Sequence, residues 1–214
     1  MKKRTSPGPG KAVAMKRQKQ SILSGLKSYK EKYIPGEKTR LRQKKLTDAR
    51  DDYRWQSDPE LAHLDAAPVL KLSFAVYLLD YVDSIRRPGK KRFPLSIETL
   101  KGKHIGNCTC YDIDEENSEA QVGIMIGDRD YWDRGYGSDA FMTLVDHLFL
   151  KTIAKRVYLK TLDWNMRAQK CFQNCGFTEY SRSSRNGYNF LFMEMTRKQW
   201  QKSFDRRRDE SLTH

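Results

Sequence analysis

Apolar positions alternate between strand and helix periods along the chain, and their changes of period divide it into elements. Residues 39–45 alternate weakly and predict an edge strand, and residues 46–55 carry a helix start and a helical stripe. Ser57, Asp58 and Pro59 are expected to end that helix. An apolar run that opens at Pro68 predicts a second helix reaching about Tyr81.

The middle of the chain predicts three strands and then a helix. The strands are expected over residues 92–98, 105–112 and 119–126, joined by a turn at Gly102 and by the acidic loop 114–117. Such short connections predict an antiparallel meander. A loop with glycines follows, and apolar residues at helical spacing from Ala140 predict a helix to about Lys151.

The remaining elements complete an α/β fold of the α+β kind. The strand 156–160 is followed by a short helix that Asn165 caps and Gly176 ends. Two final strands, 177–181 and 188–195, meet across Asn186 and Gly187, a strong hairpin signal. The expected order is therefore β-α-α-β-β-β-α-β-α-β-β, in a mostly antiparallel, twisted sheet.

Positive charge is concentrated at one end of the chain. The 214 residues carry a formal net charge of +14, and residues 1–45 hold fifteen Lys or Arg against only Glu31 and Glu37. Residues 1–17 lack the apolar content to fold and are expected to be disordered, whereas Ile22, Leu26, Tyr29 and Tyr33 share a helical face. Clustered cations favour RNA, a ribosome or another polyanion as partner. A solvated tail that aids solubility explains them equally well.

Composition sets the domain organisation. We expect a basic arm over residues 1–36, a catalytic domain over 37–198 and a charged tail over 199–214. No apolar run approaches the roughly 20 residues that cross a bilayer, and no leader-like segment follows the N-terminal basic residues, which predicts a cytoplasmic protein without a membrane partner. The four cysteines lack the spacing of a disulfide framework or a metal site, so reduced thiols and no metal are expected.

The glycine loop before the helix at residue 140 carries the main chemical signal. Gly135 and Gly137 stand where the first backbone N–H groups of that helix have no intrahelical partner, which suits a pyrophosphate. A dinucleotide fingerprint would need its strand to run almost directly into the first glycine, but residues 127–134 intervene. No Gly-Lys-Ser/Thr closes the turn, which excludes a P-loop. Asp139 is expected to favour the helix start.

Two segments carry a family resemblance. The run GIMIGDRDYWDRGYGSDA (123–140), with NMRAQKCFQNCGF (165–177) downstream, resembles the GCN5-related N-acetyltransferase (GNAT) superfamily. The texture is most similar to its branch of ribosomal-protein-alanine N-acetyltransferases. The resemblance is strong over residues 121–177 and looser from Thr39 onward. It implies acetyl-CoA as co-substrate and a wedge where the strand ending at Ile126 and the strand starting near Arg156 splay apart.

The same resemblance assigns the cofactor-binding residues. Backbone groups of Ile124 and Ile126 would pair with the pantetheine amides, and an N–H of Met125 or Ile126 would polarise the thioester carbonyl. The phosphates and the far wall of the wedge would be contacted by Arg134, Gly135, Tyr136, Gly137, Ser138, Asn165 and Phe172.

Two positions depart from the family pattern. Phe172 stands where many members have a tyrosine that protonates the leaving thiolate, and Gln121 stands where a carboxylate often acts as base. A thiol of pKa about 8.5 needs little help to leave, so the missing acid is tolerable. We expect Glu119, on the same strand face as Gln121, to be the base, and the variant Glu119→Gln to lose turnover while keeping acetyl-CoA affinity.

The expected function is an acetyl-CoA-dependent N-acetyltransferase that acts by direct attack in a ternary complex. Its acceptor would be a primary amine on a protein N-terminus, a ribosomal protein, or a small polyamine or aminoglycoside. The alternative is a catalytically weak module of the same fold that binds RNA or the ribosome through its basic arm. The acceptor, like the oligomeric state, stays open at this stage.

Overall fold

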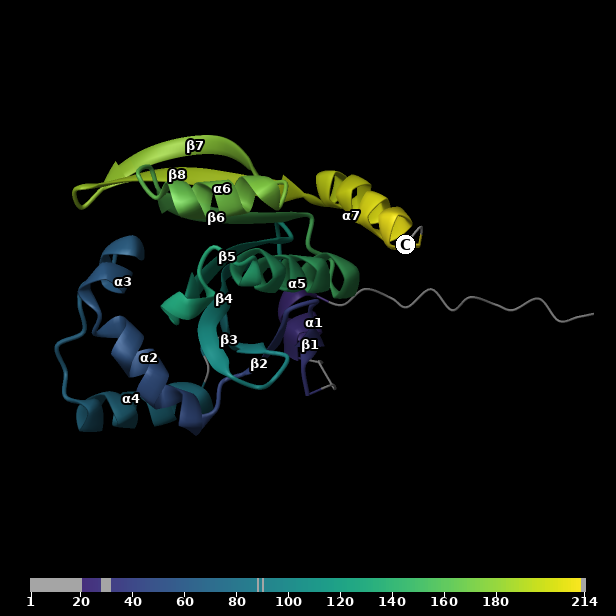
Figure 1. The fold of residues 1–214 in the computed structure, drawn as a ribbon. Helices are drawn as coiled ribbons and strands as arrows, with labels where there is room; N and C mark the ends of the chain where they lie inside the picture. The colour runs from purple at the N-terminus through teal and green to yellow at the C-terminus, as the bar shows by residue number, and fades with distance from the viewer. Residues whose placement is uncertain (1–20, 28–31, 88, 90, 213–214) are drawn as a thin grey trace, which may run out of the picture.

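The computed structural model describes residues 21–27, 32–87, 89 and 91–212. Within them one eight-stranded sheet runs in the order β1-β2-β3-β4-β5-β6-β8-β7, and every neighbouring pair is antiparallel except β5 and β6 (Figure 1). The strands are β1 Ile34–Pro35, β2 Thr39–Gln43, β3 Arg92–Thr99, β4 His104–Asp114, β5 Glu119–Ile126, β6 Arg156–Leu162, β7 Thr178–Arg185 and β8 Tyr188–Thr196. The predicted α/β fold with a mostly antiparallel sheet is confirmed.

Helices lie on both sides of this sheet (Figure 1). The helical segments are α1 Ile22–Lys27, η1 Leu46–Asp48, α2 Ala49–Gln56, α3 Pro59–Leu64, α4 Phe74–Arg86, η2 Arg129–Tyr131, α5 Tyr136–Lys151, α6 Met166–Asn174 and α7 Arg197–Leu212. The main core forms where α1, α5 and α6 meet the sheet, and α5 buries Phe141, Leu144 and Leu148 completely there. A second, smaller cluster joins α2 to α4 through Ala49, Tyr77 and Tyr81.

Two helix boundaries in the first half differ from expectation. Pro59 does not only end a helix but starts α3, because the Asp58 carboxylate accepts hydrogen bonds from the N–H groups of Glu60 and Leu61 at 3.0 and 3.1 Å. The helix expected from Pro68 begins only at Phe74, where the Ser73 hydroxyl accepts from Val76 N–H. In both places a side-chain cap decides the helix start.

The second half follows the sequence pattern closely. Asn165 caps α6 by accepting from Ala168 N–H at 3.2 Å, and Gly176 follows that helix with φ +88°. Asn186 and Gly187 both have positive φ, the backbone of a tight hairpin between β7 and β8. Residues 199–212, expected as part of a charged tail, belong to the helix α7.

The ends of the described chain pack on the main core. Trp200 of α7 is 1% exposed, stacks on Phe149 and donates to the Asp146 carboxylate at 2.6 Å. Ile22 and Leu26 of α1 are buried in the same core, so their helical face packs on the domain. Residues 1–17, expected to be disordered, lie outside the described residues, as do Tyr29 and Lys30.

A buried ionic network fastens the segment before α2 to the sheet. Arg42 of β2 donates to both oxygens of Asp48, at 2.6 and 2.7 Å, and also binds Glu98 of β3. Asp48 further accepts from the Ser96 hydroxyl at 2.7 Å and from Lys45 N–H at 2.9 Å. Buried carboxylates are stable only with such partners. The network therefore fixes the position of η1, from which α2 continues.

Within the described part of the chain, no helix is long and apolar enough to cross a membrane. The expectation of a cytoplasmic location goes beyond this finding and stays a prediction.

Candidate functional site

The two halves of the sheet separate between β5 and β6. Their parallel pairing covers only three residues of each strand and ends at Gln121 and Tyr158. Beyond that point β5 continues beside β4 as far as Ile126, while β6 continues beside β8 as far as Leu162. The predicted splay is present, and it leaves one edge of the β5 segment 122–126 without a neighbouring strand.

A cavity of about 720 Å³ opens at this splay. Its walls come from α3, the end of β5, the loop that leads into α5, the first turn of α5, and α6. Eight of the predicted cofactor residues line it, namely Ile124, Met125, Ile126, Gly135, Gly137, Ser138, Asn165 and Phe172. Segments from residues 61 to 174 thus meet at one place, as the sequence pattern requires.

Backbone groups of β5 face this cavity in alternation. Gly127 N–H donates to the Ile105 carbonyl at 3.0 Å, so Ile126 and its partner Gly106 form a pair that is not bonded to each other. The backbone groups of Ile126, and of Ile124 two residues earlier, therefore point away from β4 and toward the open side. Those of Met125 point toward β4. The Ile126 carbonyl is already taken by the Trp132 indole N–H at 2.6 Å.

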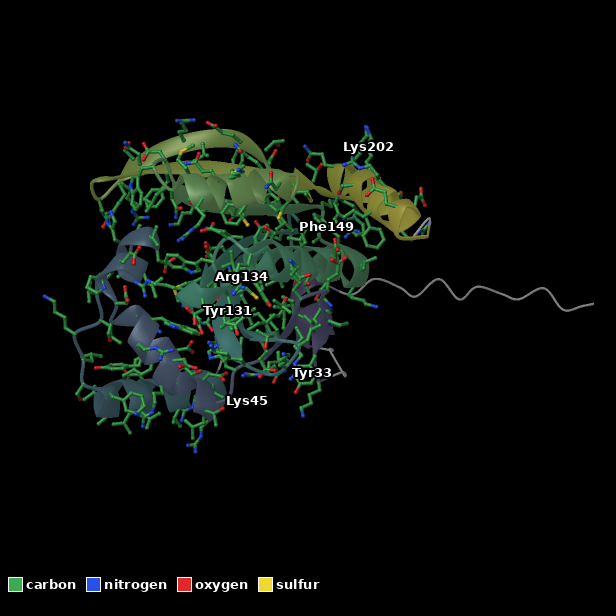
Figure 2. All side chains as sticks on the ribbon, viewed as in Figure 1. Tyr33, Lys45, Tyr131, Arg134, Phe149 and Lys202 are labelled. Atoms are coloured by element: carbon green, nitrogen blue, oxygen red, sulfur yellow. The ribbon has the colours of Figure 1, made fainter. Side chains whose placement is uncertain are left out.

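The N-terminus of α5 forms the end of the cavity near this loop. Gly135 is its N-cap with φ +81°, a left-handed conformation that a residue without Cβ adopts at low cost. The first intrahelical bond reaches Asp139 N–H, which leaves the N–H groups of residues 136–138 without intrahelical partners. Figure 2 shows Tyr131 and Arg134 on the segment that precedes this helix.

Two predicted residues of this loop do not line the cavity. The Arg134 guanidinium donates to the Asp130 carbonyl at 3.0 Å, and its own carbonyl accepts from the Lys38 ammonium at 3.1 Å. Tyr136 packs edge-on against Tyr131. Asp139 was expected to favour the helix start; the structure gives it a different structural role, since its carboxylate accepts from the backbone N–H groups of residues 37, 38 and 39 and so ties the turn after β1 to α5.

The α6 side supplies cations that the sequence prediction missed. Arg167 and Lys170 line the cavity beside the glycine loop, and the Arg167 guanidinium lies 3.6 Å from the centre of the Trp132 ring. Their i, i+3 spacing on a short helix was the available signal, because it puts both on one face. Phe172 is 6% exposed and packs on Phe141, so an apolar ring occupies the place of the family's tyrosine.

Cys171 of α6 contacts the loop directly. Its sulfur lies 3.2 Å from the Ser138 hydroxyl, and hydrogen bonds from Cys175 and Ser138 lower the pKa of Cys171 to about 7 although burial opposes this. In contrast, burial raises the pKa of Cys108 to about 12. Cys171 is thus the thiol with the greater thiolate character, and it lines the cavity.

The predicted base is not brought to the cavity. Glu119 lies at the start of β5, before the splay, and its carboxylate binds the Arg156 guanidinium at 2.7 Å. Gln121 is 5% exposed and donates to the Tyr111 hydroxyl at 2.9 Å. A carboxylate that sequence reasoning missed, Asp65 at the C-terminal end of α3, does line the cavity.

Comparison with known families decides the identity of the fold. Residues 38–178 match the model of the acetyltransferase (GNAT) domain. The chain belongs to the GNAT acetyltransferase family. This confirms the resemblance at the level of the superfamily, and the chain is an acyltransferase of the N-acetyltransferase class. A curated relative, the uncharacterized N-acetyltransferase p20 of Bacillus licheniformis, is 27% identical over 143 residues, which is 66% of this chain and 79% of the relative.

Solved structures share the fold of this GNAT acetyltransferase. The spermidine N-acetyltransferase of Vibrio cholerae, in complex with CoA and spermine, has a TM-score of 0.67 and 17% identity and covers 76% of this chain and 98% of its own. An aminoglycoside acetyltransferase in complex with coenzyme A has a TM-score of 0.65 and 17% identity, covering 77% and 98%. At such identities the likeness concerns the fold alone.

Among the described residues, no group of three or more His, Cys, Asp or Glu is placed to hold a metal ion. The same residues contain four cysteines, and all four are free.

Proposed function

We propose that this GNAT acetyltransferase transfers an acetyl group from acetyl-CoA to a primary amine by direct attack. The observation that carries the proposal is the cavity at the β5–β6 splay, which joins an open strand edge to the N-terminus of α5. An open strand edge offers hydrogen bonds to the amides of a pantetheine chain, and a helix N-terminus favours a pyrophosphate. The relatives solved with CoA support the same use of the cavity.

The coenzyme is proposed to lie along β5 with its phosphates at the glycine loop. Backbone groups of Ile124 and the N–H of Ile126 would pair with the pantetheine, and the N–H groups of residues 136–138 would receive the pyrophosphate. Arg167 and Lys170, rather than Arg134, are the cations best placed to neutralise the phosphates. In this orientation the thioester would reach toward the closed end of the splay.

Most of the rate acceleration is proposed to come from holding the amine and the thioester together. Of the two donors predicted for the thioester carbonyl, the Met125 N–H points to β4, and the Ile126 N–H, which points to the open side, lies at the phosphate end and would pair with the pantetheine instead. Phe172 offers no proton, and the leaving thiolate, of pKa about 8.5, would depart without a general acid.

The acceptor is proposed to be a primary amine of a protein N-terminus, a ribosomal protein, a polyamine or an aminoglycoside. The named relatives act on amines of the last two kinds, and the ribosomal-protein branch is suggested by residues 123–140. Binding of RNA or a ribosome by residues 1–45 stays a prediction, because residues 1–20 and 28–31 lie outside the described part.

The test is acetyl transfer by the purified full-length chain. Acetyl-CoA is offered with peptides, polyamines and aminoglycosides, and free thiol release and product mass are measured together. We expect acetyl-CoA to bind with calorimetrically measurable affinity and one amine class to be acetylated. Tight, salt-dependent RNA binding without turnover of any amine would instead support the weakly catalytic module.

A further inference from the structure

Asp65 is one of two aspartates that line the cavity. It caps the C-terminal end of α3, and Leu61 and Leu64 of the same helix line the cavity beside it. Of the cavity-lining side chains, only Asp65 and Asp133 carry a carboxylate, and Asp133 belongs to the loop at the other end, near Gly135. Asp65 is therefore the carboxylate on the acceptor side.

The helix that carries Asp65 is held by three side-chain contacts with two partners, Arg129 and Trp164. Its N-cap Asp58 binds Arg129 of η2 at 2.9 Å, and Glu60 binds the same guanidinium at 2.6 Å. Its outer residue His63 stacks on Trp164, with ring centres 4.5 Å apart and planes 18° apart. Trp164 follows β6, so α3 bridges the splay between the two half-sheets. These contacts fix the helix end that presents Asp65.

A row of polar side chains crosses the sheet at the closed end of the splay. Arg92, Tyr111, Gln121 and Tyr158 are direct partners on four neighbouring strands and so share one face. Gly123 follows on that face, where an added Cβ would lie 3.1 Å from the Tyr111 hydroxyl. The thioester would reach toward this row if the coenzyme lies as proposed.

Asp65 interacts electrostatically with this row. Lys160 of β6 and Arg92 of β3 are the cations that act on its carboxylate, and Asp65 in turn raises the pKa of Tyr111 of β4. None of the contacts that cap and fix α3 in the described structure involves the Asp65 carboxylate. Asp65 is an exposed residue of the cavity wall, yet the protein around its carboxylate desolvates it and raises the pKa of Asp65 above its ordinary value, against the effect of the two cations.

We propose that Asp65 is the general base of the acetyl transfer, a role that rests on the proposed function. Its carboxylate takes one proton from the acceptor ammonium, directly or through a water, and later gives it to solvent. The free amine forms the C–N bond, the C–S bond breaks, and the second nitrogen proton goes to the departing thiolate. The products are the acetylated amine, CoA with its thiol, and one proton.

Glu119 is the competing base, and geometry favours Asp65. Glu119 sits before the splay and does not line the cavity, and its carboxylate is committed to Arg156, which also binds Glu194 at 2.5 Å. Asp65 lines the cavity, and none of its electrostatic neighbours forms an ion pair with it at the 2.5–2.9 Å distances of the pairs above. A base needs a free oxygen within reach of the ammonium.

The experiment compares Asp65→Asn with Glu119→Gln and with Asp83→Asn. Asp83 is a matched surface aspartate on α4 whose side chain is 64% exposed. With the amine that wild type acetylates best, kcat/KM is measured from pH 6 to 10, and acetyl-CoA affinity is measured by calorimetry. We expect Asp65→Asn to lower kcat/KM by roughly 10²–10⁴-fold near pH 7 with unchanged acetyl-CoA affinity. The deficit should shrink at high pH, where the amine is already neutral.

The outcomes separate the two ideas. If Asp65→Asn keeps wild-type turnover, Asp65 is not the general base, and the proposed function stands. The same conclusion follows if the variant changes only KM and its pH profile runs parallel to that of wild type. Loss confined to Glu119→Gln restores the sequence-based assignment. Acetyl-CoA binding by wild type without turnover of any amine overturns the proposed function, and the role of Asp65 with it. Asp65→Glu, which restores a carboxylate, should recover part of the activity.

Discussion

Replacing Asp48 by Asn removes the negative charge from the buried network that joins β2, β3 and η1. Asp48 is 2% exposed and accepts four hydrogen bonds, two of them from Arg42, whose side chain is 4% exposed. Breaking a buried ion pair on one side costs on the order of 3–5 kcal/mol, because the remaining charge keeps its desolvation penalty. A domain of this kind is stable by about 5–15 kcal/mol in total. The variant should therefore lose about a fifth or more of its unfolding free energy.

The pH dependence distinguishes this mechanism from a general loss of packing. Burial alone would raise the pKa of Asp48, but the bonds from Arg42, Lys45 and Ser96 hold the pKa well below its ordinary value. The carboxyl titrates near 3.9 in the unfolded chain, so its stabilisation is complete above about pH 5 and is lost as the pH falls toward its lower folded pKa. The difference in unfolding free energy between wild type and Asp48→Asn should thus narrow below about pH 4.

Urea unfolding monitored by tryptophan fluorescence measures the loss of unfolding free energy and its dependence on pH. Asp83→Asn is the control, since the Asp83–Arg87 pair spans 3.5 Å on the surface and should change stability by less than about 1 kcal/mol. A loss of under about 1 kcal/mol for Asp48→Asn at pH 7 would refute the reasoning on the buried pair. A gap that stays constant down to pH 3 would refute the electrostatic explanation.

Two further predictions concern the coenzyme cavity. Gly137→Val places branched carbons where a phosphate would approach; since a bond to a charged group contributes about 1.5–3 kcal/mol, acetyl-CoA affinity measured by calorimetry should fall roughly tenfold to a hundredfold. The Cβ added at residue 137 meets only Ile126 at 3.6 Å, so folding should be spared. Gly89→Ala, whose added Cβ has no atom within 4 Å, is the control. The second prediction concerns thiol reactivity: iodoacetamide should modify Cys171 before Cys108. The rate at Cys171 should rise through about pH 7 and fall when acetyl-CoA is bound, as followed by peptide mass spectrometry. Equal labelling of Cys171→Ser and wild type would contradict this.

Elements set by local chemistry were predictable from sequence. The stop at Gly176, the cap at Asn165 and the hairpin at Asn186 and Gly187 each depend on one residue's backbone preference or on one short-range hydrogen bond. The Pro68 prediction failed because the helix within this apolar run starts only at Phe74, after the Ser73 cap. Leu70 N–H is bonded to the Gln56 carbonyl at 2.9 Å instead, a contact that no periodicity encodes.

The site was predictable where it follows the backbone and unpredictable where it depends on packing. The strand edge at Ile124 and the glycine turn at Gly135 belong to one continuous segment of the sequence, so their residue pattern can be recognised there. Asp65 and Lys170 come from helices that meet only in the fold, at positions where an exposed charged residue is the ordinary expectation. The assignment of Glu119 assumed that a shared strand face means a shared site, but the splay begins two residues later.

The contact of Arg129 with both Asp58 and Glu60 joins the loop before α5 to the first turn of α3. The loop belongs to the proposed coenzyme wall and the helix to the proposed acceptor wall. The Arg129 guanidinium therefore links the two segments that would hold the two ligands. Coupling between two ligands is reciprocal: the factor by which bound coenzyme alters the Kd of the amine equals the factor by which the amine alters the Kd of the coenzyme. Arg129→Gln would therefore change one measured cooperativity factor in both titrations equally, whichever substrate is added first.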